Sequence, residues 1–495
     1  MKRGKRKMML SAAMMLLTAL SMDGSPVRLL GVAEDYANRS LELTTYADYV
    51  SRMKKPAGVV DVGADGRFDV TLEIEEVTYA FLELSTYTAS IYLEPGRTYD
   101  IELPPLRVRA DADRFNPFYQ PERVELAIEG DAGGLNESLR KVDRYYNKAY
   151  TESAIRLVRG HDKALAERLM SSIDSVAAAT GCKDTYFTQH VEYRKAQVYA
   201  TPRMQAPRAV LSRYYTGRPV LYNVVSYWET LEMLSVDIFG SSSTTRVSGQ
   251  MRKALGKSGC TMEDLSEIAS KDTLWSRDRT LREAMIVKGI HDNYYARMLT
   301  EDKTDSMLTS AATSSEGHRN RLMAANIYAQ KNKLRPGLPA PELNLVDEND
   351  KRLTLSDFRG KFVYLCFAHT GNYECLRALP ALESLQRVHR EDLEVVVVFT
   401  NEEAKEAMDY VRANNFTWLA LPFTSNQKII FDYEVHGLPT YFLIDPDGFI
   451  SMSQAPGPTE KVGPAIATAI RSYLMENKGH RDVPRTIYDI ANETK

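Results

Sequence analysis

The spacing of apolar residues changes along this chain, and that change limits the fold more than any single motif does. From Val27 to about Leu103, apolar and polar residues alternate, which predicts strands. From about Asn136 to Lys333, apolar residues recur every three or four positions, which predicts helices. After a proline-rich linker the two patterns alternate, which predicts a sheet flanked by helices. With 495 residues, the chain is long enough for several domains of a multidomain α+β protein.

The N-terminal region, residues 25–132, is predicted to form a small antiparallel β-sandwich or barrel. Turn signals such as Glu94-Pro95-Gly96 separate its short apolar runs, and several short strands with regular turns are typical of such folds. Residues 107–132 are predicted to be a loop-rich continuation. The expected strands lie at residues 40–44, 68–72, 79–84 and 90–93.

The middle region, residues 136–333, is predicted to be an all-helical domain. Leu165, Leu169 and Ile173 recur at helical spacing, and Thr180-Gly181 marks the end of that helix. The region also carries pairs of adjacent tyrosines. They could line a groove for a peptide or a glycan, although such tyrosines more often join the packed interior to the surface. The pairs are Tyr145-Tyr146, Tyr214-Tyr215 and Tyr294-Tyr295.

The C-terminal region, residues 334–476, is predicted to be an α/β domain. It begins with the proline-rich linker LRPGLPAP, and a polar tail at residues 477–495 follows it. Strands that alternate with helices imply a central sheet with helices on both faces. The expected strands are residues 343–346, 353–355, 362–367, 394–399, 418–421, 440–444 and 449–453, and the expected helices are residues 375–390, 402–413 and 459–475.

The first 21 residues are predicted to be a secretory signal peptide. The segment MKRGKRK carries five positive charges and no acid, and the apolar run from Met8 to Leu20 is too short to cross a bilayer. Ala19 and Ser21 provide small residues for cleavage, and a short membrane anchor is the alternative. Without the five leader cations, 58 basic residues face 66 acidic ones, a net charge of −8. This charge argues against nucleic acid and anionic membrane surfaces as partners, and no membrane span is predicted in the mature chain.

Three sequence features follow one another in the C-terminal region. They are GLPAPELNLVDENDKRLTLSDFRGKFVYLCFA (residues 337–368), the spacing from Cys375 to Pro380, and VHGLPTYFLIDPDG (residues 435–448). Together they resemble the TlpA-like thioredoxin family of bacterial envelope proteins, with an AhpC/TSA-redoxin-like domain. The preceding β region and helical spacer are similar to those of multidomain members in Gram-negative envelopes. The resemblance implies a thioredoxin-like fold, a periplasmic or cell-envelope location, and disulfide exchange by a dithiol that begins the first long helix, beside a cis-proline.

The resemblance assigns most positions of that site to residues of this chain, but not the attacking thiol. The cis-proline carries over to Pro439, which Thr440 follows, and the resolving cysteine carries over to Cys375. Asn372 occupies the attacking position, and Tyr373-Glu374 replaces the usual Gly-Pro pair. Exchange by a dithiol needs a low-pKa thiolate and a second thiol to resolve the mixed disulfide. Because asparagine is a good helix N-cap, Asn372 is expected to keep the structural role of its position and to lose the chemical one.

The other cysteines and one histidine leave further readings open. Cys366 is predicted to be a small core side chain, or else the partner of Cys375 in an unconventional redox pair. His369 could serve as a base for a peroxidatic Cys375, although a loop histidine more often faces solvent. Cys182 and Cys260 are interpreted as buried thiols of the helical region, and a bridge between them is the alternative.

The sequence therefore predicts an exported thioredoxin-fold envelope protein with a degenerate Asn-x-x-Cys site, acting as a non-catalytic binding or scaffold module. A protein or peptide partner is expected at the face formed by Pro439 and Cys375. The alternative is a thiol-disulfide oxidoreductase that works through Cys375 with Cys366 or with a partner's thiol, and a peroxidase-like antioxidant is a third reading. No cofactor is expected, and no histidine pair or cysteine cluster indicates a metal site.

Overall fold

The computed structural model describes residues 24–107, 109, 119–240, 244–296, 298–349, 351–401, 403–423, 429–460, 462–476 and 487. The chain divides into two compact units, an N-terminal unit (1–109, 120–328 and 487–495) and a C-terminal unit (110–119 and 329–486). The predicted signal peptide and, apart from Ile487, the predicted polar tail lie outside the described residues. The N-terminal unit contains both the β part and the helical part.

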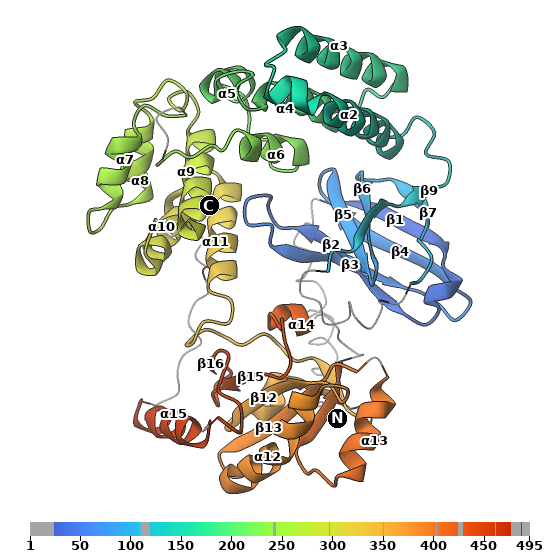
Figure 1. Ribbon diagram of the computed structural model, residues 1–495, viewed down its shortest axis with the longest axis vertical. Helices are drawn as coiled ribbons and strands as arrows, with labels where there is room; N and C mark the ends of the chain where they lie inside the picture. Colours follow the sequence, from blue (N-terminus) through green and yellow to red (C-terminus); the bar gives the residue numbers. More distant parts are fainter. Residues whose placement is uncertain are drawn as a thin grey trace, which may run out of the picture. The chain divides into compact units, whose positions relative to one another are not determined.

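Two sheets form the β part of the N-terminal unit (Figure 1). One sheet has the strand order β4-β1-β7-β9 and the other β3-β2-β5-β6-β8. Alternation turns one face of each sheet toward a shared apolar core, which includes Leu29, Leu82 and Ile91. The four predicted strands are confirmed. The strands are β1 (Ser25–Val32), β2 (Ser40–Tyr46), β3 (Lys54–Asp61), β4 (Arg67–Ile74), β5 (Thr78–Leu84), β6 (Tyr87–Leu93), β7 (Thr98–Glu102), β8 (Glu122–Glu125) and β9 (Ala127–Ile128).

Most strand pairs of this sandwich are antiparallel, as predicted, but two are parallel. They join β1 to β7 and β6 to β8. Both β8 and β9 lie in the stretch predicted to be loop-rich. The four residues of β8, ERVE, carry too little alternation to indicate a strand, and only the ladder with β6 defines them as one.

Helices form the second part of the N-terminal unit, as predicted. Asp162 caps α3 by accepting a hydrogen bond from the backbone N–H of Leu165, and Asp184 caps α4 in the same way. The helix α3 ends at Thr180 because Gly181 adopts a left-handed conformation, with φ of 72°. The helices are α2 (Leu135–Val158), α3 (Lys163–Thr180), α4 (Thr185–Ala200), α5 (Pro207–Tyr214), α6 (Val225–Met233), α7 (Ser248–Leu255), α8 (Met262–Ala269), α9 (Arg279–Tyr295), α10 (Glu301–Ser314) and α11 (His318–Lys331).

Tyrosines take a large share of the helical core. The rings of Tyr193, Tyr215 and Tyr227 meet edge to face, with centroids 4.7 to 5.4 Å apart. The hydroxyl of Tyr215 donates a hydrogen bond to the Tyr227 carbonyl at 2.8 Å. Tyr214 and Tyr146 are buried as well. These tyrosines therefore pack the interior, so the alternative of a groove does not apply to them.

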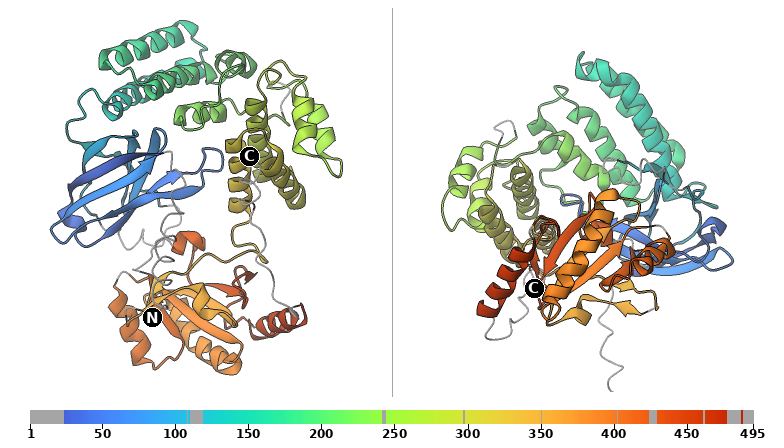
Figure 2. Two further views of the ribbon diagram at one scale, coloured as in Figure 1. Left: turned by 180° about the vertical axis from the view of Figure 1, so that it is seen from behind. Right: turned by 60° about the horizontal axis from the view of Figure 1, so that its bottom comes forward.

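The β and helical parts of the N-terminal unit lie side by side (Figure 2), and polar contacts join them. The Asn136 side chain of α2 bonds both backbone groups of Tyr92 in β6, each at 2.8 Å. Asn326 of α11 donates to Asp48 at 2.9 Å. Arg319 forms a 2.8 Å ion pair with Glu76. These contacts fix how α2 and α11 lie against the sandwich.

The C-terminal unit is built on a five-stranded sheet with the order β14-β13-β12-β15-β16. The strands β12, β13 and β14 run parallel, and β15 and β16 complete the sheet antiparallel. Every residue of β12 is buried, as expected for a central strand. The elements are β10 (Leu345–Val346), β11 (Arg352–Leu353), β12 (Phe362–Ala368), α12 (Tyr373–His389), β13 (Leu393–Phe399), α13 (Ala404–Ala413), β14 (Leu419–Pro422), α14 (Ile429–Asp432), β15 (Thr440–Ile444), β16 (Ile450–Met452) and α15 (Val462–Glu476).

Both faces of this sheet are covered. One apolar core joins alternate residues of β12 to α12, α13 and α15, and a second core joins the remaining residues to α14 and the β10–β11 hairpin. Side chains of a central strand alternate between the two cores, so Cys366 of β12 faces the core under α12. Within the described part of the chain, no helix is long and apolar enough to cross a membrane.

Candidate functional site

The start of α12 is organised by Asn372. The chain leaves the buried strand β12, turns at residues 369–372 and enters the helix. The Asn372 side-chain oxygen accepts hydrogen bonds from the backbone N–H groups of Glu374 at 2.9 Å and Cys375 at 3.2 Å. The predicted capping role of Asn372 is confirmed. Two amides that could stabilise an anion at this helix end are therefore bound to a neutral side chain.

The loop before β15 lies against this helix end. The peptide bond between Leu438 and Pro439 is cis, as predicted. The Asn372 side-chain N–H donates to the Leu438 carbonyl at 3.4 Å, and the Thr440 hydroxyl donates to the Gly437 carbonyl at 2.5 Å. Leu438 also packs against the apolar core that contains Cys375. The fold thus brings together the predicted site residues from α12 and from the proline loop.

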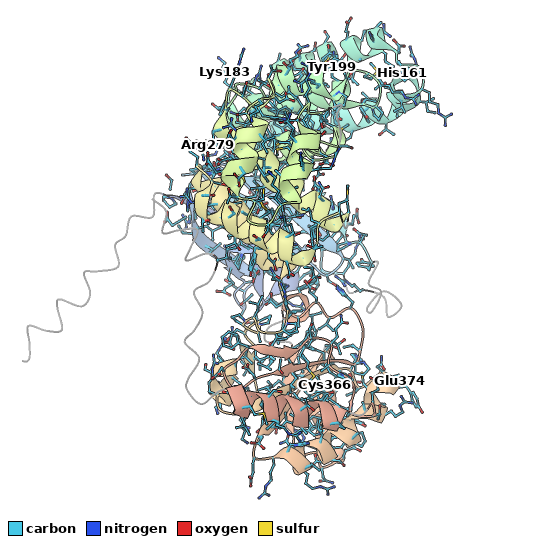
Figure 3. The ribbon with its side chains drawn as sticks, turned by 90° about the vertical axis from the view of Figure 1, so that its left-hand side faces the viewer. His161, Lys183, Tyr199, Arg279, Cys366 and Glu374 are labelled. Carbon is cyan, nitrogen blue, oxygen red and sulfur yellow. The ribbon has the colours of Figure 1, made fainter. Side chains whose placement is uncertain are left out.

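Cys375 and Cys366 are both buried thiols of the same apolar core. Burial raises the pKa of Cys375 from 9.0 to about 11, against a smaller opposing effect from a backbone hydrogen bond with His369. Burial also raises the pKa of Cys366, and interaction with the Cys375 thiol raises it further. In Figure 3, Cys366 lies inside the C-terminal unit, whereas Glu374 lies at its edge. Both thiols are therefore protonated at neutral pH, and neither is a ready nucleophile.

No two of the four cysteines are bonded to each other. All are free thiols, so the alternative bridge between Cys182 and Cys260 is not present. Cys260 is buried, as expected, whereas Cys182 is half-buried. Cys366 and Cys375 belong to the same apolar core and do not form a disulfide, as expected.

His369 does not face solvent, contrary to the expectation for a loop histidine. Its exposed fraction is 7%, and its Nδ1 accepts a hydrogen bond from the backbone N–H of Gly371 at 2.8 Å. The expectation was wrong because His369 directly follows the buried strand β12 and turns back onto the tight loop before α12. Its Nδ1 holds this loop together and is not available as a base for Cys375.

A hydrogen-bond network outside the predicted site residues fixes the same loop from the other side. Asn401, directly after β13, accepts a hydrogen bond from the backbone N–H of Thr370 at 3.2 Å and donates to the Thr370 hydroxyl at 2.5 Å. Asn401 also donates to Glu406 of α13 at 3.1 Å. Its position at the carboxyl end of a buried parallel strand is the signal that could have identified it.

A groove of about 530 Å³ opens beside the proline loop. Its wall includes the backbone on both sides of Pro439, together with Glu374 and Arg377 of α12, and Cys375 is not part of its lining. Tyr373, at the helix start, is exposed over 75% of its surface. The groove is thus accessible, whereas the nearby Cys375 thiol is buried and does not line it. Its lining on the proline loop consists of His436, Gly437, Leu438, Pro439, Thr440 and Tyr441.

The central sheet, the capped first helix and the cis-proline loop that meets it define a thioredoxin-fold domain. The AhpC/TSA family matches residues 336–453. Thiol-disulfide oxidoreductase ResA of Bacillus thuringiensis is 31% identical over 122 residues, which cover 24% of this chain and 70% of that protein. Thioredoxin-like protein YneN of Bacillus subtilis is 32% identical over 131 residues, which cover 25% of this chain and 76% of that protein. Through its C-terminal domain, the chain belongs to the TlpA-like thioredoxin-fold family.

Solved structures were also compared with the chain. The solution structure of a thiol:disulfide interchange protein from Bacteroides sp. is 20% identical, covers 30% of this chain and 97% of its own, and has a TM-score of 0.26. The family match at residues 336–453 does not include the sandwich or the helical part of the N-terminal unit.

Proposed function

We propose that this chain is an exported envelope protein whose thioredoxin-fold domain binds an extended segment of a partner protein and does not work as a dithiol oxidoreductase. The observation that carries the proposal is the start of α12, where Asn372 fills the cap and Cys375 is buried with its pKa raised to about 11. Without an attacking thiolate there is no first step of disulfide exchange.

The binding half of the proposal depends on backbone groups at the groove. In the described part of the chain, the N–H groups of Gly437 and Leu438 donate no hydrogen bond. Both residues line the groove beside Pro439. An extended peptide can pair with such groups as an added strand, so that the backbone supplies affinity and the groove accommodates side chains.

The N-terminal residues support export. A basic segment precedes an apolar run that is too short to span a bilayer, and small residues follow it. We place the protein in the periplasm or cell envelope of a Gram-negative bacterium. N-terminal sequencing of the protein from its native host should begin after residue 21, and a chain that still starts at Met1 would contradict export.

The catalytic half is tested by insulin reduction in the presence of dithiothreitol. The mature protein should add nothing to the rate with dithiothreitol alone. Asn372→Cys should raise the rate, because it restores a thiol three residues before Cys375. Asn372→Ser is the matched control, since it keeps a capping side chain but adds no thiol. Turnover by the unmodified protein at the rate of a dithiol enzyme would overturn the proposal.

The binding half is tested with alkylated insulin B chain as an extended probe and two substitutions at one residue. Gly437→Ala should leave binding unchanged, because no atom lies within 4 Å of the added Cβ. Gly437→Pro removes the N–H and should weaken binding at least tenfold, as measured by fluorescence anisotropy. Equal affinity of the two variants would show that the loop backbone does not hold the peptide.

One observation favours the oxidoreductase as a second candidate. The thiols of Cys366 and Cys375 share one apolar core, and after burial, the nearby Cys375 thiol further raises the pKa of Cys366. A linked Cys366–Cys375 peptide, found by mass spectrometry of the alkylated and non-reduced protein, would make an internal redox pair the leading function. Two separately alkylated peptides would leave the binding module in place.

A further inference from the structure

The N-terminal unit contains a cavity of its own, far from the residues of the proline groove in sequence and built from other elements. Its volume is about 490 Å³, within the range of about 300–1,000 Å³ that is usual for small-molecule sites. One wall is a sheet face formed by β2, β5, β6 and β8, and the other wall comes from α2, α4 and α6. Figure 1 and Figure 2 show these helices next to that sheet.

The sheet wall is aromatic. In the β5–β6 ladder, Tyr79 lies opposite Tyr92 and Phe81 lies opposite Ser90, so all four side chains share one face. The ring centroids of Tyr79 and Tyr92 are 5.2 Å apart, and those of Tyr46 and Phe81 are also 5.2 Å apart. Tyr46, Tyr79 and Tyr92 are only partly buried. This face therefore presents a continuous aromatic surface to the cavity.

Trp228 stands on the helical wall. Its indole N–H donates to the Leu221 carbonyl at 3.1 Å, which fixes the ring. The core tyrosines Tyr193, Tyr215 and Tyr227 are buried. Among the rings that line this cavity, Trp228 and Phe81 are buried as well, whereas Tyr46, Tyr79 and Tyr92 keep part of their surface exposed. Large flat apolar surfaces that remain unfilled in this way are suited to a ligand with flat apolar faces.

The rest of the lining is charged but balanced, with five basic and five acidic side chains. Arg194 is part of this lining and is 12% exposed. It binds Asp143 at 2.7 Å and Glu229 at 2.6 Å. Arg52 binds Glu232 at 2.7 Å. Since these charges compensate one another, the cavity offers many donors and acceptors and almost no net charge.

Arg123 differs from the other basic side chains of the lining. In the described part of the chain its side chain has neither an ion-pair nor a hydrogen-bond partner. Burial raises the pKa values of Tyr46 and Tyr79, and the nearby Arg123 charge partly opposes this rise. It projects from β8 on the same face as Ser90 and Glu125, which are neighbours in the β6–β8 ladder. Its guanidinium donors are therefore available to a ligand above the aromatic face.

These features exclude several ligand classes. A peptide strand cannot be added here, because the wall is a sheet face whose backbone groups are already paired in the ladders. A phosphate or polyanion would need a surplus of basic side chains, which the balanced lining lacks. A purely apolar ligand would leave the charged side chains without polar partners. A hydroxyl-rich ligand with apolar ring faces avoids all three problems, because it needs no free backbone groups, carries no charge and offers polar partners to the charged side chains.

We propose that this cavity binds a neutral oligosaccharide. The C–H faces of the sugar rings would stack on Tyr46, Tyr79 and Tyr92. The sugar hydroxyls would bond Arg194, Glu229 and the unpaired Arg123, each of which suits a group that both donates and accepts. This site is separate from the proline groove and does not depend on the state of Cys375.

Calorimetric titration of the full mature chain tests the proposal. The probes are cellotetraose, maltotetraose, mannotetraose and chitotetraose, with tetragalacturonic acid as the charged counterpart. At least one neutral tetrasaccharide should bind with a Kd below about 1 mM, and it should bind more tightly than the acidic one. Saturation-transfer NMR should show the ring C–H protons of the bound sugar in contact with the protein.

Three variants locate the site. Tyr79→Ala removes a stacking ring and should weaken binding at least tenfold. Ser90→Trp fills the cavity without removing an aromatic side chain and should have the same effect, so the test holds even if Tyr79→Ala lowers stability. Tyr295→Ala, an exposed tyrosine of the same unit outside the cavity, should change nothing. No heat from any neutral probe at about 10 mM, stronger binding of tetragalacturonic acid, or unchanged binding by Ser90→Trp would overturn the proposal.

Discussion

The two candidate binding regions of this chain, the proline groove at the start of α12 and the cavity of the N-terminal unit, differ in the charge of their polar groups. At the start of α12, the ionisable position is filled by the neutral amide of Asn372, and the nearby thiols are buried and protonated. In the cavity of the N-terminal unit, ten charged side chains line the wall, and most of them are paired. Burying charges costs free energy unless each one is bonded. The comparison fits the two proposals: in the first, the C-terminal unit keeps the shape of a redox site without its charge, and in the second, the N-terminal unit maintains charges that a ligand can use.

The largest expected effect comes from breaking the charged network. Arg194→Ala leaves Asp143 and Glu229 without their shared partner, although Asp143 keeps its 2.8 Å contact with His190, so the free energy of unfolding should fall by about 3 kcal/mol. Urea unfolding followed by tryptophan fluorescence measures the change. Arg218→Ala is the matched control, because its ion pair with Glu192 at 2.6 Å is 41% and 37% exposed, and its loss should cost about 0–1 kcal/mol. Equal effects would mean that the cavity network contributes no more than a surface pair.

The second effect concerns the ionisation of Cys375. A pKa raised from 9.0 to about 11 corresponds to about 100-fold less thiolate at pH 8. Alkylation by iodoacetamide, followed peptide by peptide, should therefore be at least 100-fold slower at Cys375 in the folded protein than in urea. The half-buried Cys182 is the internal reference and should be alkylated first. Rapid alkylation of Cys375 below pH 9 would show that the start of α12 holds a reactive thiol.

The same shift has a consequence for stability. Because the folded state holds its proton more tightly than the unfolded state, the contribution of Cys375 is fully present below pH 9 and is lost as the pH rises toward 11. In Cys375→Ser, the free energy of unfolding should therefore depend less on pH between about pH 9 and 11. The difference in slope should correspond to at most one proton released on unfolding. If the free energy of unfolding depends on pH equally in this variant and in the unmodified protein, the fold does not hold the thiol in its neutral form.

Local pattern was enough to predict the C-terminal site, but not the N-terminal cavity. The run from Phe362 to Ala368, the cap at Asn372 and the loop at Pro439 each depend on short-range signals that the sequence carries. The cavity exists only because a face of the sheet that contains β5 and β6 packs near α2, α4 and α6 in the folded chain. Asp143 and Arg194 are 51 positions apart, and Tyr79 lies on a strand that no local pattern relates to either helix. The short strand β8 was missed for the same reason, because its partner defines it.

The third effect tests whether Asn372 holds α12 by itself. Asn372→Ala removes the acceptor for the N–H groups of Glu374 and Cys375, and loss of such a cap should cost about 1 kcal/mol. Thermal unfolding of the C-terminal unit, followed by the fluorescence of Trp418, provides the measurement. Asp184→Ala at the start of α4 is a control cap in the other unit and should cost a similar amount. No change for Asn372→Ala would mean that packing around β12 holds the helix without the cap.

The smallest effect separates the two bonds that Asn372 makes. Asn372→Ser keeps a capping oxygen but loses the amide that donates to the Leu438 carbonyl at 3.4 Å. Because that bond is long, the cost in stability should be about 0.5 kcal/mol or less. The same change makes the Leu438 carbonyl more available beside the N–H groups of the groove, so alkylated insulin B chain should bind at least as tightly as it does to the unmodified protein. Weaker binding by Asn372→Ser than by the unmodified protein would show that the peptide contacts the amide of Asn372 itself, and residue 372 would then belong to the binding surface in its own right.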